Sequence, residues 1–315
     1  MRNEKILIIG GMGFLGKNLA LSLAAKNEVI IFDKYIDTSV VKKLERIKLI
    51  KGDIRSYNFN RLFNREDISY VFHLAALVGV EKVSKRPSET INIELTGISN
   101  VLHSLKGCSV KRFIYSSSSC VYGETNSKHD SIENGRLKPL GCYGCAKLLA
   151  EEALKEYSNT MGVNYSIIRY FNVYGRFQKS KMVVPRFFEQ ALNNRPITIY
   201  GDGTQTRDFT YIKDAVAATI RIAEHKNSKN DIFNVGTGRE NSILQLTKLI
   251  KAISKSSSPI IFAEIPKPRT YYEVRRRVCN TNKLKKILGF ECKTTLKAGL
   301  RLSLPYFKNL WGGRK

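Results

Sequence analysis

Short apolar runs alternate with longer segments of helical periodicity through the first half of the chain. Lys5–Ile9 is almost continuously apolar, as is typical of a strand buried on both faces of a parallel sheet. The strands expected on this basis are Lys5–Ile9, Glu28–Asp33, Lys48–Lys51, Tyr70–Leu74, Arg112–Ser116 and Tyr165–Tyr170. The helices expected between or after them are Phe14–Lys26, Thr90–Leu105 and Tyr143–Tyr157. This alternation predicts an α/β fold with a doubly wound parallel sheet of the Rossmann type.

The second half of the chain is less regular but carries both kinds of pattern. The helices expected there are Pro185–Asn193, Ile212–Glu224 and Ser242–Ser254, and the short strands are Pro196–Tyr200 and Ile232–Val235. The tail that begins at Leu310 is expected to be mobile. These patterns predict a smaller C-terminal α/β unit beside the main sheet.

Apolar run lengths and cysteine usage exclude several classes of protein. No run reaches the roughly 18 apolar residues that span a bilayer, and the chain enters its first strand without the apolar core of a signal peptide. We therefore expect a cytoplasmic protein that does not enter the membrane. Six cysteines are too few for a disulfide framework in 315 residues. Cys142 and Cys145 form a CxxC pair without nearby histidines, so no metal site is expected.

The net charge of +26 is high and raises the question of a polyanionic partner. The positive residues are spread along the chain, with some increase near the end, and form no block of about five or six like charges. We attribute the charge to a lysine-rich surface, and nucleic-acid binding is not expected.

A glycine motif stands where the first strand meets the first helix. Gly10, Gly13 and Gly16 have GxxGxxG spacing, which permits a tight turn, an approach to a pyrophosphate and close helix packing. The second strand ends in Asp33, about 20 residues on, where a carboxylate can bind a ribose hydroxyl. Because this carboxylate would repel a 2′-phosphate, the pattern favours NAD, and the adjacent Lys34 leaves NADP as the alternative.

Tyr143 and Lys147 are four residues apart in a predicted helix and so share one face. A nearby ammonium and an oxidised nicotinamide would favour the phenolate. Lowering the phenol pKa from about 10 by three units requires about 4 kcal/mol. Upstream, the predicted strand that begins at Arg112 runs into four consecutive serines at its carboxyl end, where open α/β sheets bind ligands.

These residues occur together with further motifs in one order along the chain. The motifs are Gly10–Gly16, Asp33, Gly52–Ile54, His73–Ala76, Ser116–Gly123, Tyr143–Lys147, Arg169–Asn172, Gly201–Phe209 and Phe233–Gly238. In this combination the chain resembles the extended short-chain dehydrogenase/reductase family, in its nucleotide-sugar epimerase and dehydratase branch. The resemblance runs from residue 5 to about residue 290.

The resemblance implies a role for each matching position. Asp53 and Ile54 would contact adenine, Ala75 would line the cofactor groove, and Lys147 would bind the nicotinamide ribose. The full set expected to bind NAD is Gly10, Gly13, Phe14, Leu15, Gly16, Asp33, Asp53, Ile54, Leu74, Ala75, Ala76, Tyr143, Lys147 and Tyr170.

The substrate implied by the resemblance is a sugar linked to a nucleoside diphosphate. Tyr143 would be the acid/base and Ser118 would hydrogen-bond the reacting sugar hydroxyl. Asn172 and Arg207 would bind the diphosphate. Arg269 would do likewise, although the spacing around it departs from the commoner family pattern.

The family's reactions share a first step, in which Tyr143 deprotonates the sugar 4-hydroxyl as hydride leaves C4. The 4,6-dehydratases are acidic at the two positions after the serine or threonine, and the decarboxylases keep a glutamate at the second. Here the residues are Ser119 and Cys120, so neither reaction is favoured. A 4-epimerase needs no further acid, and a UDP-sugar 4-epimerase is our prediction.

Three alternatives remain open. A GDP-sugar 3,5-epimerase would use Cys120 as an acid, but Gln178–Val184 lacks the partner histidine. A 4-dehydrogenase or 4-keto-sugar reductase would stop at the first step. Some superfamily members bind RNA without catalysis, but Ser118, Tyr143 and Lys147 are all retained here.

The resemblance also implies a layout and an assembly. Residues 1–171 and 206–237 would form the NAD domain, and residues 172–205 and 238–315 the nucleotide-sugar domain. Thr90–Leu105 and Tyr143–Tyr157 match the helices by which family members dimerise, so a homodimer is expected.

Overall fold

The computed structural model describes residues 1–38, 45–179 and 181–312. Its main element is a seven-stranded sheet in the order β11, β6, β5, β4, β1, β2, β3, with every neighbouring pair parallel. The strands are β1 Lys5–Ile9, β2 Glu28–Asp33, β3 Ile47–Lys51, β4 Tyr70–His73, β5 Arg112–Ser118, β6 Tyr165–Tyr170 and β11 Asp231–Val235. The strand order reverses between β1 and β4, which is where doubly wound sheets bind ligands.

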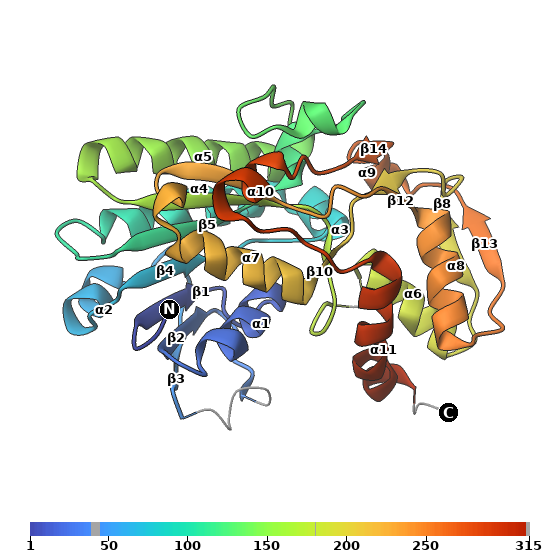
Figure 1. Cartoon of the computed structure of the whole chain (residues 1–315), viewed down its shortest axis with the longest axis horizontal. Helices are drawn as coiled ribbons and strands as arrows, with labels where there is room; N and C mark the ends of the chain where they lie inside the picture. The colour runs from blue at the N-terminus through green and yellow to red at the C-terminus, as the bar shows by residue number, and fades with distance from the viewer. Residues whose placement is uncertain (39–44, 180, 313–315) are drawn as a thin grey trace.

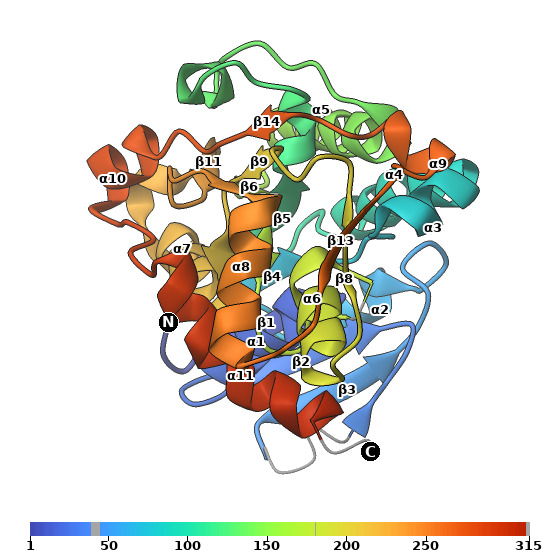
Figure 2. The same ribbon diagram turned by 90° about the vertical axis from the view of Figure 1, so that its right-hand side faces the viewer.

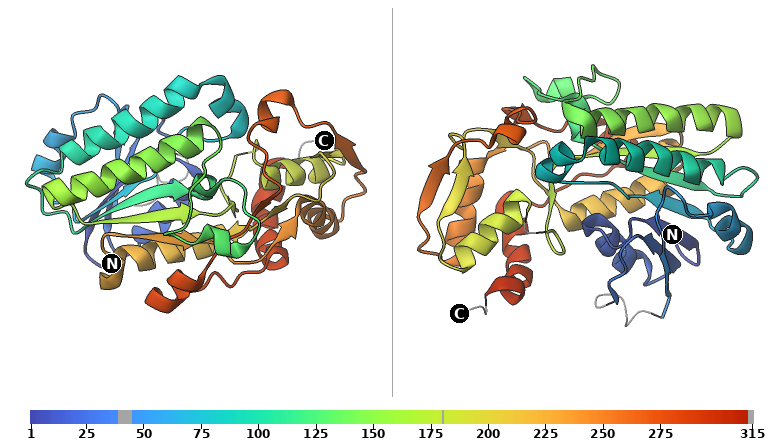
Figure 3. Two further views of the ribbon diagram at one scale, coloured as in Figure 1. Left: turned by 90° about the horizontal axis from the view of Figure 1, so that it is seen from above. Right: turned by 180° about the vertical axis from the view of Figure 1, so that it is seen from behind.

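Helices cover both faces of this sheet. α2 (Phe59–Arg65), α4 (Pro87–His103) and α5 (Gly141–Met161) pack on one face, and α1 (Phe14–Leu23) and α7 (Ile212–Glu224) on the other (Figures 1 and 3). The inner strands β1, β2 and β4 are largely apolar because both faces are buried. The predicted Rossmann-type α/β fold is confirmed.

A smaller body stands beside the carboxyl ends of the strands (Figure 2). It contains the parallel strands β8 (Ile197–Tyr200) and β13 (Ile260–Ala263) with helices α6 (Val183–Leu192), α8 (Ile243–Ser254) and α11 (Leu296–Trp311).

Helix α11 corrects the expectation of a mobile tail. Phe307 stacks between Phe188 and Trp311 at ring-centroid distances of 4.8 and 5.3 Å, so the end of the helix is held by apolar burial. Leu310 belongs to the same helix, and residues 313–315 lie outside the described residues.

Short elements connect the two bodies. β9 (Thr206–Arg207) pairs with β12 (Asn241–Ser242) and β14 (Arg276–Arg277), and β7 (Val173–Tyr174) pairs with β10 (Thr210–Tyr211). The remaining elements are α3 (Val80–Lys85), η2 (Ser119–Tyr122), η3 (Lys128–Ser131), η4 (Lys226–Ser228), α9 (Lys267–Thr270) and α10 (Asn282–Leu288). None of the helices in the described ranges combines the length and apolar character needed to cross a membrane.

Three element ends differ from the expected ones for local reasons. The first helix stops at Leu23, whose carbonyl accepts from the Asn27 side chain at 2.9 Å. Helix α5 runs on to Met161 because Gly162, at φ +71°, supplies the left-handed cap. Strand β5 extends to Ser118, which pairs in register with Tyr170, so Ser117 and Ser118 belong to the strand and not to a loop.

Candidate active site

The glycine turn after β1 is built for a close approach. Gly10 has φ +81°, and a Cβ there would lie 2.6 Å from the Ala75 nitrogen. A Cβ on Gly16 would lie 2.4 Å from the Gly10 carbonyl oxygen, so the start of α1 packs directly on the turn. Gly13 is the N-cap of α1 and no side chain of the described residues caps it, which leaves backbone N–H groups for an anion.

Two aspartates follow β2 and β3 beside this turn. Asp33 accepts from the backbone nitrogens of Met12 at 2.9 Å and Tyr35 at 3.1 Å, so its carboxylate is fixed against the glycine turn. Asp53 pairs with Arg55 at 2.6 Å and Lys34 at 3.2 Å, and the Arg55 hydrogen bond holds the pKa of Asp53 well below its usual range. Asp53 therefore remains ionised at neutral pH.

The other residues expected to bind NAD lie around the same strand ends. Ile54 is buried after Asp53, and the Leu74 nitrogen donates to the Ile9 carbonyl at 2.8 Å, which brings Leu74, Ala75 and Ala76 beside β1. Phe14 and Leu15 open α1. Tyr170 is different, because its buried hydroxyl lies 2.6 Å from the Thr219 hydroxyl in α7. A turn that a Cβ would fill, an uncapped helix start and two carboxylates fit a dinucleotide such as NAD.

Ser118, Tyr143 and Lys147 converge from β5 and α5. The two α5 residues share a face, and the Lys147 Nζ lies 5.8 Å from the Tyr143 ring centroid. Tyr143 also hydrogen-bonds with Ser118 at the end of β5. The Lys147 ammonium donates to the Ser116 carbonyl at 2.7 Å. The structure thus brings together the three residues that the sequence predicts for catalysis.

The groups around Tyr143 act on its ionisation in opposite directions. Burial first, and then the charge of Glu94, raise the pKa of Tyr143 well above its ordinary value, while the hydrogen bond with Ser118 opposes the shift. Lys147 does not act on Tyr143 alone, because its Nζ forms an ion pair with Glu94 at 3.0 Å. The sequence alone does not reveal this carboxylate beside Lys147.

Cys120 lies one turn beyond Ser118, in η2. Its backbone nitrogen donates to the Ser118 hydroxyl at 3.1 Å, and its sulfur accepts from Arg277 Nη1 at 3.4 Å. Arg277 also donates to the Gly123 carbonyl at 2.9 Å. The thiol is therefore close to the catalytic group and paired with a cation from β14.

Arginines gather where the smaller body meets the end of β7. Arg207 pairs with Glu273 at 2.6 Å, and Arg269 pairs with the same carboxylate at 3.0 Å. The guanidinium groups of Arg186 and Arg269 lie 4.7 and 5.4 Å from the Tyr200 ring centroid. Burial, together with neighbouring arginines and against the pull of Glu273, lowers the pKa of Arg207 to about 10.

Asn172 directly precedes β7. Its φ of 25° lies in the left-handed region, which asparagine tolerates better than most residues. Its buried Oδ1 has no hydrogen-bond partner among the described residues. An unpaired buried acceptor suits a ligand that can donate a hydrogen bond to it.

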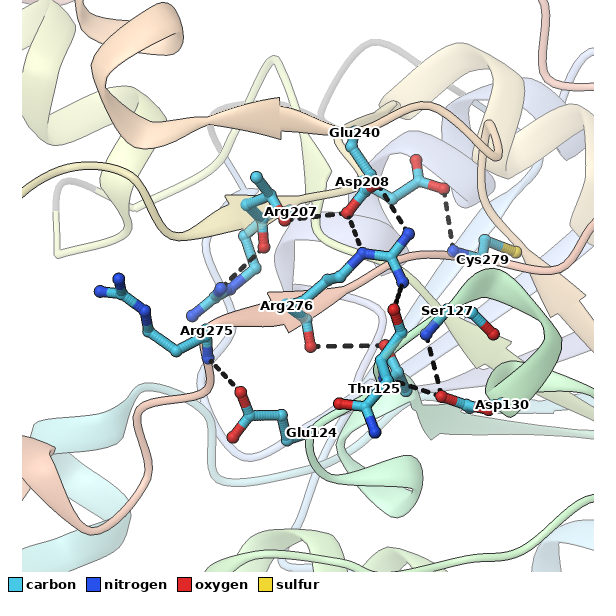
Figure 4. A network of polar contacts seen from close by, with 12 residues as sticks. Glu124, Thr125, Ser127, Asp130, Arg207, Asp208, Glu240, Arg275, Arg276 and Cys279 are labelled. Carbon is cyan, nitrogen blue, oxygen red and sulfur yellow. Dashed lines mark hydrogen bonds and ion pairs between the residues drawn. The ribbon is translucent and has the colours of Figure 1, made fainter.

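Strand β14 ties the loop after Ser118 to the smaller body (Figure 4). The Arg276 carbonyl accepts from the Thr125 nitrogen at 3.2 Å, and the Arg275 nitrogen donates to Glu124 at 3.2 Å. The Arg276 guanidinium bonds Glu240 at 2.5 and 2.8 Å and also donates to the Asn126 carbonyl. This network fixes the loop after Ser118 to β14 and to Glu240.

Asp208 is the buried anchor of the same region (Figure 4). Its carboxylate accepts from the Thr237 nitrogen at 2.9 Å, the Thr237 hydroxyl at 2.6 Å, the Gly238 nitrogen at 2.7 Å and the Cys279 nitrogen at 3.3 Å. These bonds join β9, the end of β11 and the segment that follows β14.

Three residues of the site escaped the sequence analysis, namely Glu94, Arg186 and Arg277. Glu94 could have been recognised from the sequence, because it is an acidic residue on the face of α4 that also holds the buried Thr90, Gly97 and Ile98. Arg186 and Arg277 could not, since arginines are common throughout this chain.

The model of one protein family matches residues 6–236, about three quarters of the chain, and is described as the NAD dependent epimerase/dehydratase family. The chain belongs to this family. It is therefore an NAD-dependent enzyme, and the resemblance inferred from the motifs is confirmed.

Individual relatives cover nearly the whole chain. A *Methanocaldococcus jannaschii* protein provisionally named UDP-glucose 4-epimerase is 33% identical over 309 residues, 96% of this chain and 98% of its own. A UDP-N-acetyl-α-D-glucosaminuronate decarboxylase of *Bacillus cytotoxicus* is 33% identical over 322 residues, covering 98% of each. The UDP-glucuronic acid 4-epimerase of *Bacillus cereus*, solved with UDP-glucuronic acid and NAD, is 30% identical with a TM-score of 0.90, over 98% of this chain and 100% of that one.

Proposed function

We propose that this family member is a 4-epimerase of a UDP-linked sugar. The observation that carries the proposal is the group formed by Ser118, Tyr143 and Lys147, with Ser119 and Cys120 in place of the acidic residues of dehydratases and decarboxylases. Relatives named as 4-epimerases of UDP-glucose and UDP-glucuronic acid support it.

The residues of the site divide the work of the reaction. Ser118 hydrogen-bonds the sugar 4-hydroxyl, and Tyr143, as phenolate, takes its proton. Bound NAD would serve as acceptor and then as donor of the C4 hydride. Asn172, Arg207 and Arg269 hold the diphosphate, so the 4-keto sugar turns while the nucleotide stays in place. Tyr143 then returns the proton to the oxygen on C4, whose configuration is now inverted.

In this scheme, the Glu273 carboxylate pairs with the arginines of the diphosphate site before the diphosphate binds. Its carboxylate bonds both Arg207 and Arg269, and a diphosphate offers the same two arginines a higher negative charge. When the diphosphate replaces the Glu273 carboxylate, the nucleotide is bound and both guanidinium groups keep an anionic partner.

The alternative that a specific contact favours is 3,5-epimerisation with Cys120 as the acid. The Cys120 backbone nitrogen donates to the Ser118 hydroxyl, and its sulfur accepts from Arg277. A dehydrogenase or reductase that stops at the 4-keto sugar would use Ser118, Tyr143 and Lys147 without change. The 4-epimerase and each of these alternatives predict a different deuterium labelling of the product.

We also propose the division into domains, the assembly and the location implied by the resemblance. Residues 1–171 and 206–237 bind NAD, and 172–205 and 238–315 bind the nucleotide sugar. Two chains pair through α4 and α5, where Ile91 and Leu149 are 40% and 55% exposed. The protein acts in the cytoplasm.

Proton NMR in D₂O tests the reaction. The protein is incubated with NAD and, separately, UDP-glucose, UDP-N-acetylglucosamine, UDP-glucuronic acid, TDP-glucose and GDP-mannose. A new anomeric signal without incorporated deuterium is expected with a UDP-sugar. Deuterium at C3, C5 or C6, or an accumulating 4-keto product, would replace the 4-epimerase with one of the alternatives.

Tyr143→Phe tests the acid/base role. Because general acid–base catalysis contributes about 10²–10⁴-fold, kcat is expected to fall by at least this much. Bound NAD, measured by fluorescence, should be retained. Tyr157→Phe on the same helix, which loses a contact with Ser99, is the matched control and should keep its activity. Undiminished turnover in the Tyr143 variant would refute the role.

A further inference from the structure

Glu94 is a buried carboxylate in direct contact with the catalytic lysine. It lies in the middle of α4, and both Glu94 and Lys147 are at most 1% exposed. One carboxylate oxygen is 3.0 Å from the Lys147 Nζ, and the other accepts from the Tyr115 hydroxyl at 2.9 Å. A charge buried this deeply is tolerated only with close partners, and here both partners belong to the site.

The contacts of Glu94 fix where the Lys147 ammonium sits. The ammonium is held between Glu94, the Ser116 carbonyl at 2.7 Å and the Tyr115 ring, whose centroid is 4.8 Å away. All three lie on the α4 and β5 side of the lysine. The Tyr143 ring is farther off, at 5.8 Å.

Other titratable groups face the same cluster from each neighbouring element. They are Tyr115 of β5, His73 of β4, Cys120 of η2 and Glu151 of α5. His73 is buried, and its pKa is lowered to about 3 by burial and by Lys147, so it is neutral in the working range. Burial and Glu94 raise the pKa of Tyr115, which therefore stays a hydrogen-bond donor. Glu94 is the negative charge that acts most strongly on Tyr143.

We propose that Glu94 is a positioning residue: its carboxylate holds the Lys147 ammonium against β5 and thereby sets the pH at which Tyr143 can act as a base. This rests on the proposed role of Tyr143. A carboxylate near a phenol disfavours the phenolate, and one that also pairs with the nearest ammonium removes part of the stabilisation that the phenolate would receive. The enzyme is therefore adapted to work at a higher pH than the tyrosine–lysine pair alone would set.

Glu94→Gln tests the proposal spectroscopically. The protein is labelled at tyrosine Cζ, and the Tyr143 resonance is identified by its loss in Tyr143→Phe. Its ionisation is followed against pH in the protein with and without NAD. The midpoint in Glu94→Gln is expected about one pH unit or more below that of the wild type in the NAD-loaded protein. Coincident titrations in the loaded protein would overturn the proposal.

The pH profile of turnover is the second readout. Activity that needs the phenolate falls on the acid side, so the acid limb of kcat/KM should move down by the same shift. Below the limb, a one-unit shift makes the variant about tenfold more active than the wild type at equal pH. A lower kcat with an unmoved limb would mean that Glu94 is merely structural.

Two further variants complete the test, one as a control and one as a substitute for Glu94→Gln. Glu89→Gln removes a carboxylate from the same helix, where Glu89 pairs with Arg86 at 3.2 Å near the surface, and its profile should match the wild type. Glu94→Asn, which is shorter, gives the same test if the glutamine does not fold. Should no nucleotide sugar be turned over, the NMR titration still decides the role of Glu94, and the failure would be that of the proposed function.

Discussion

His73 shows how a single side chain at the end of a strand couples the site to stability. It ends β4, is completely buried and packs 5.6 Å from the Tyr115 ring and 5.9 Å from the Phe113 ring. Burial, with a further contribution from Lys147, lowers its pKa from 6.5 to about 3. Since the unfolded chain takes up a proton below pH 6.5 and the folded one does not, stability is lost as pH falls from 6.5 toward 3.

His73→Leu should flatten this acid limb. Removing the titration is expected to reduce the slope of unfolding free energy against pH by up to about 1.4 kcal/mol per pH unit between pH 6 and 4. Urea unfolding across this range measures it. His103→Leu, at an exposed position, should keep the wild-type slope. An unchanged slope in the His73 variant would show that His73 is not the group responsible.

A residue pattern predicts a functional role when its spacing along the chain is specific. It does not predict a contact between residues that are distant in sequence. Gly10, Gly13 and Gly16 could be predicted because the turn excludes a Cβ, which the structure bears out at Gly10 and Gly16. The ion pair of Glu94 with Lys147 joins helices 53 residues apart in sequence, and no local pattern encodes it.

Asp208 is the point at which separate elements are joined. Its carboxylate accepts four hydrogen bonds from three residues, and an amide at this position could accept at only one of its two atoms. Asp208→Asn should therefore lower the free energy of unfolding by about 1–3 kcal/mol. Asp202→Asn, at an exposed aspartate that pairs with Arg275, should change it by less than about 0.5 kcal/mol. Urea unfolding of both variants tests this, and equal values would contradict the anchoring role.

Elements of the main sheet could be predicted from sequence far better than those of the smaller body. Strands such as Lys5–Ile9, Glu28–Asp33 and Tyr165–Tyr170 match at both ends because strands buried on two faces carry short, largely apolar runs. β13 was not predicted, since Ile261 and Phe262 are exposed on a two-stranded sheet. α11 was missed because Pro305, within the segment, argues against a helix, and because its exposed side carries Lys297, Arg301 and Lys308.

At the scale of the whole molecule, the outer face of α4 and α5 is the surface to test for assembly. Leu149→Glu places a carboxylate on this face in both copies of a twofold pair. The dissociation constant of the dimer is expected to rise by about tenfold or more. Leu302→Glu, at a 58% exposed position on α11, is the matched control. Analytical ultracentrifugation decides, and a monomeric wild type would refute the proposed dimer.

Strand β14 has a consequence for the way the protein is made. Arg275, Arg276 and Arg277 hold the loop after Ser118, yet they follow β11, the last strand of the main sheet, along the chain. The strands of the main sheet can assemble earlier, because the last of them ends at Val235. A nascent chain therefore acquires its main sheet first, and the loop after Ser118 is secured only once β14 has been synthesised.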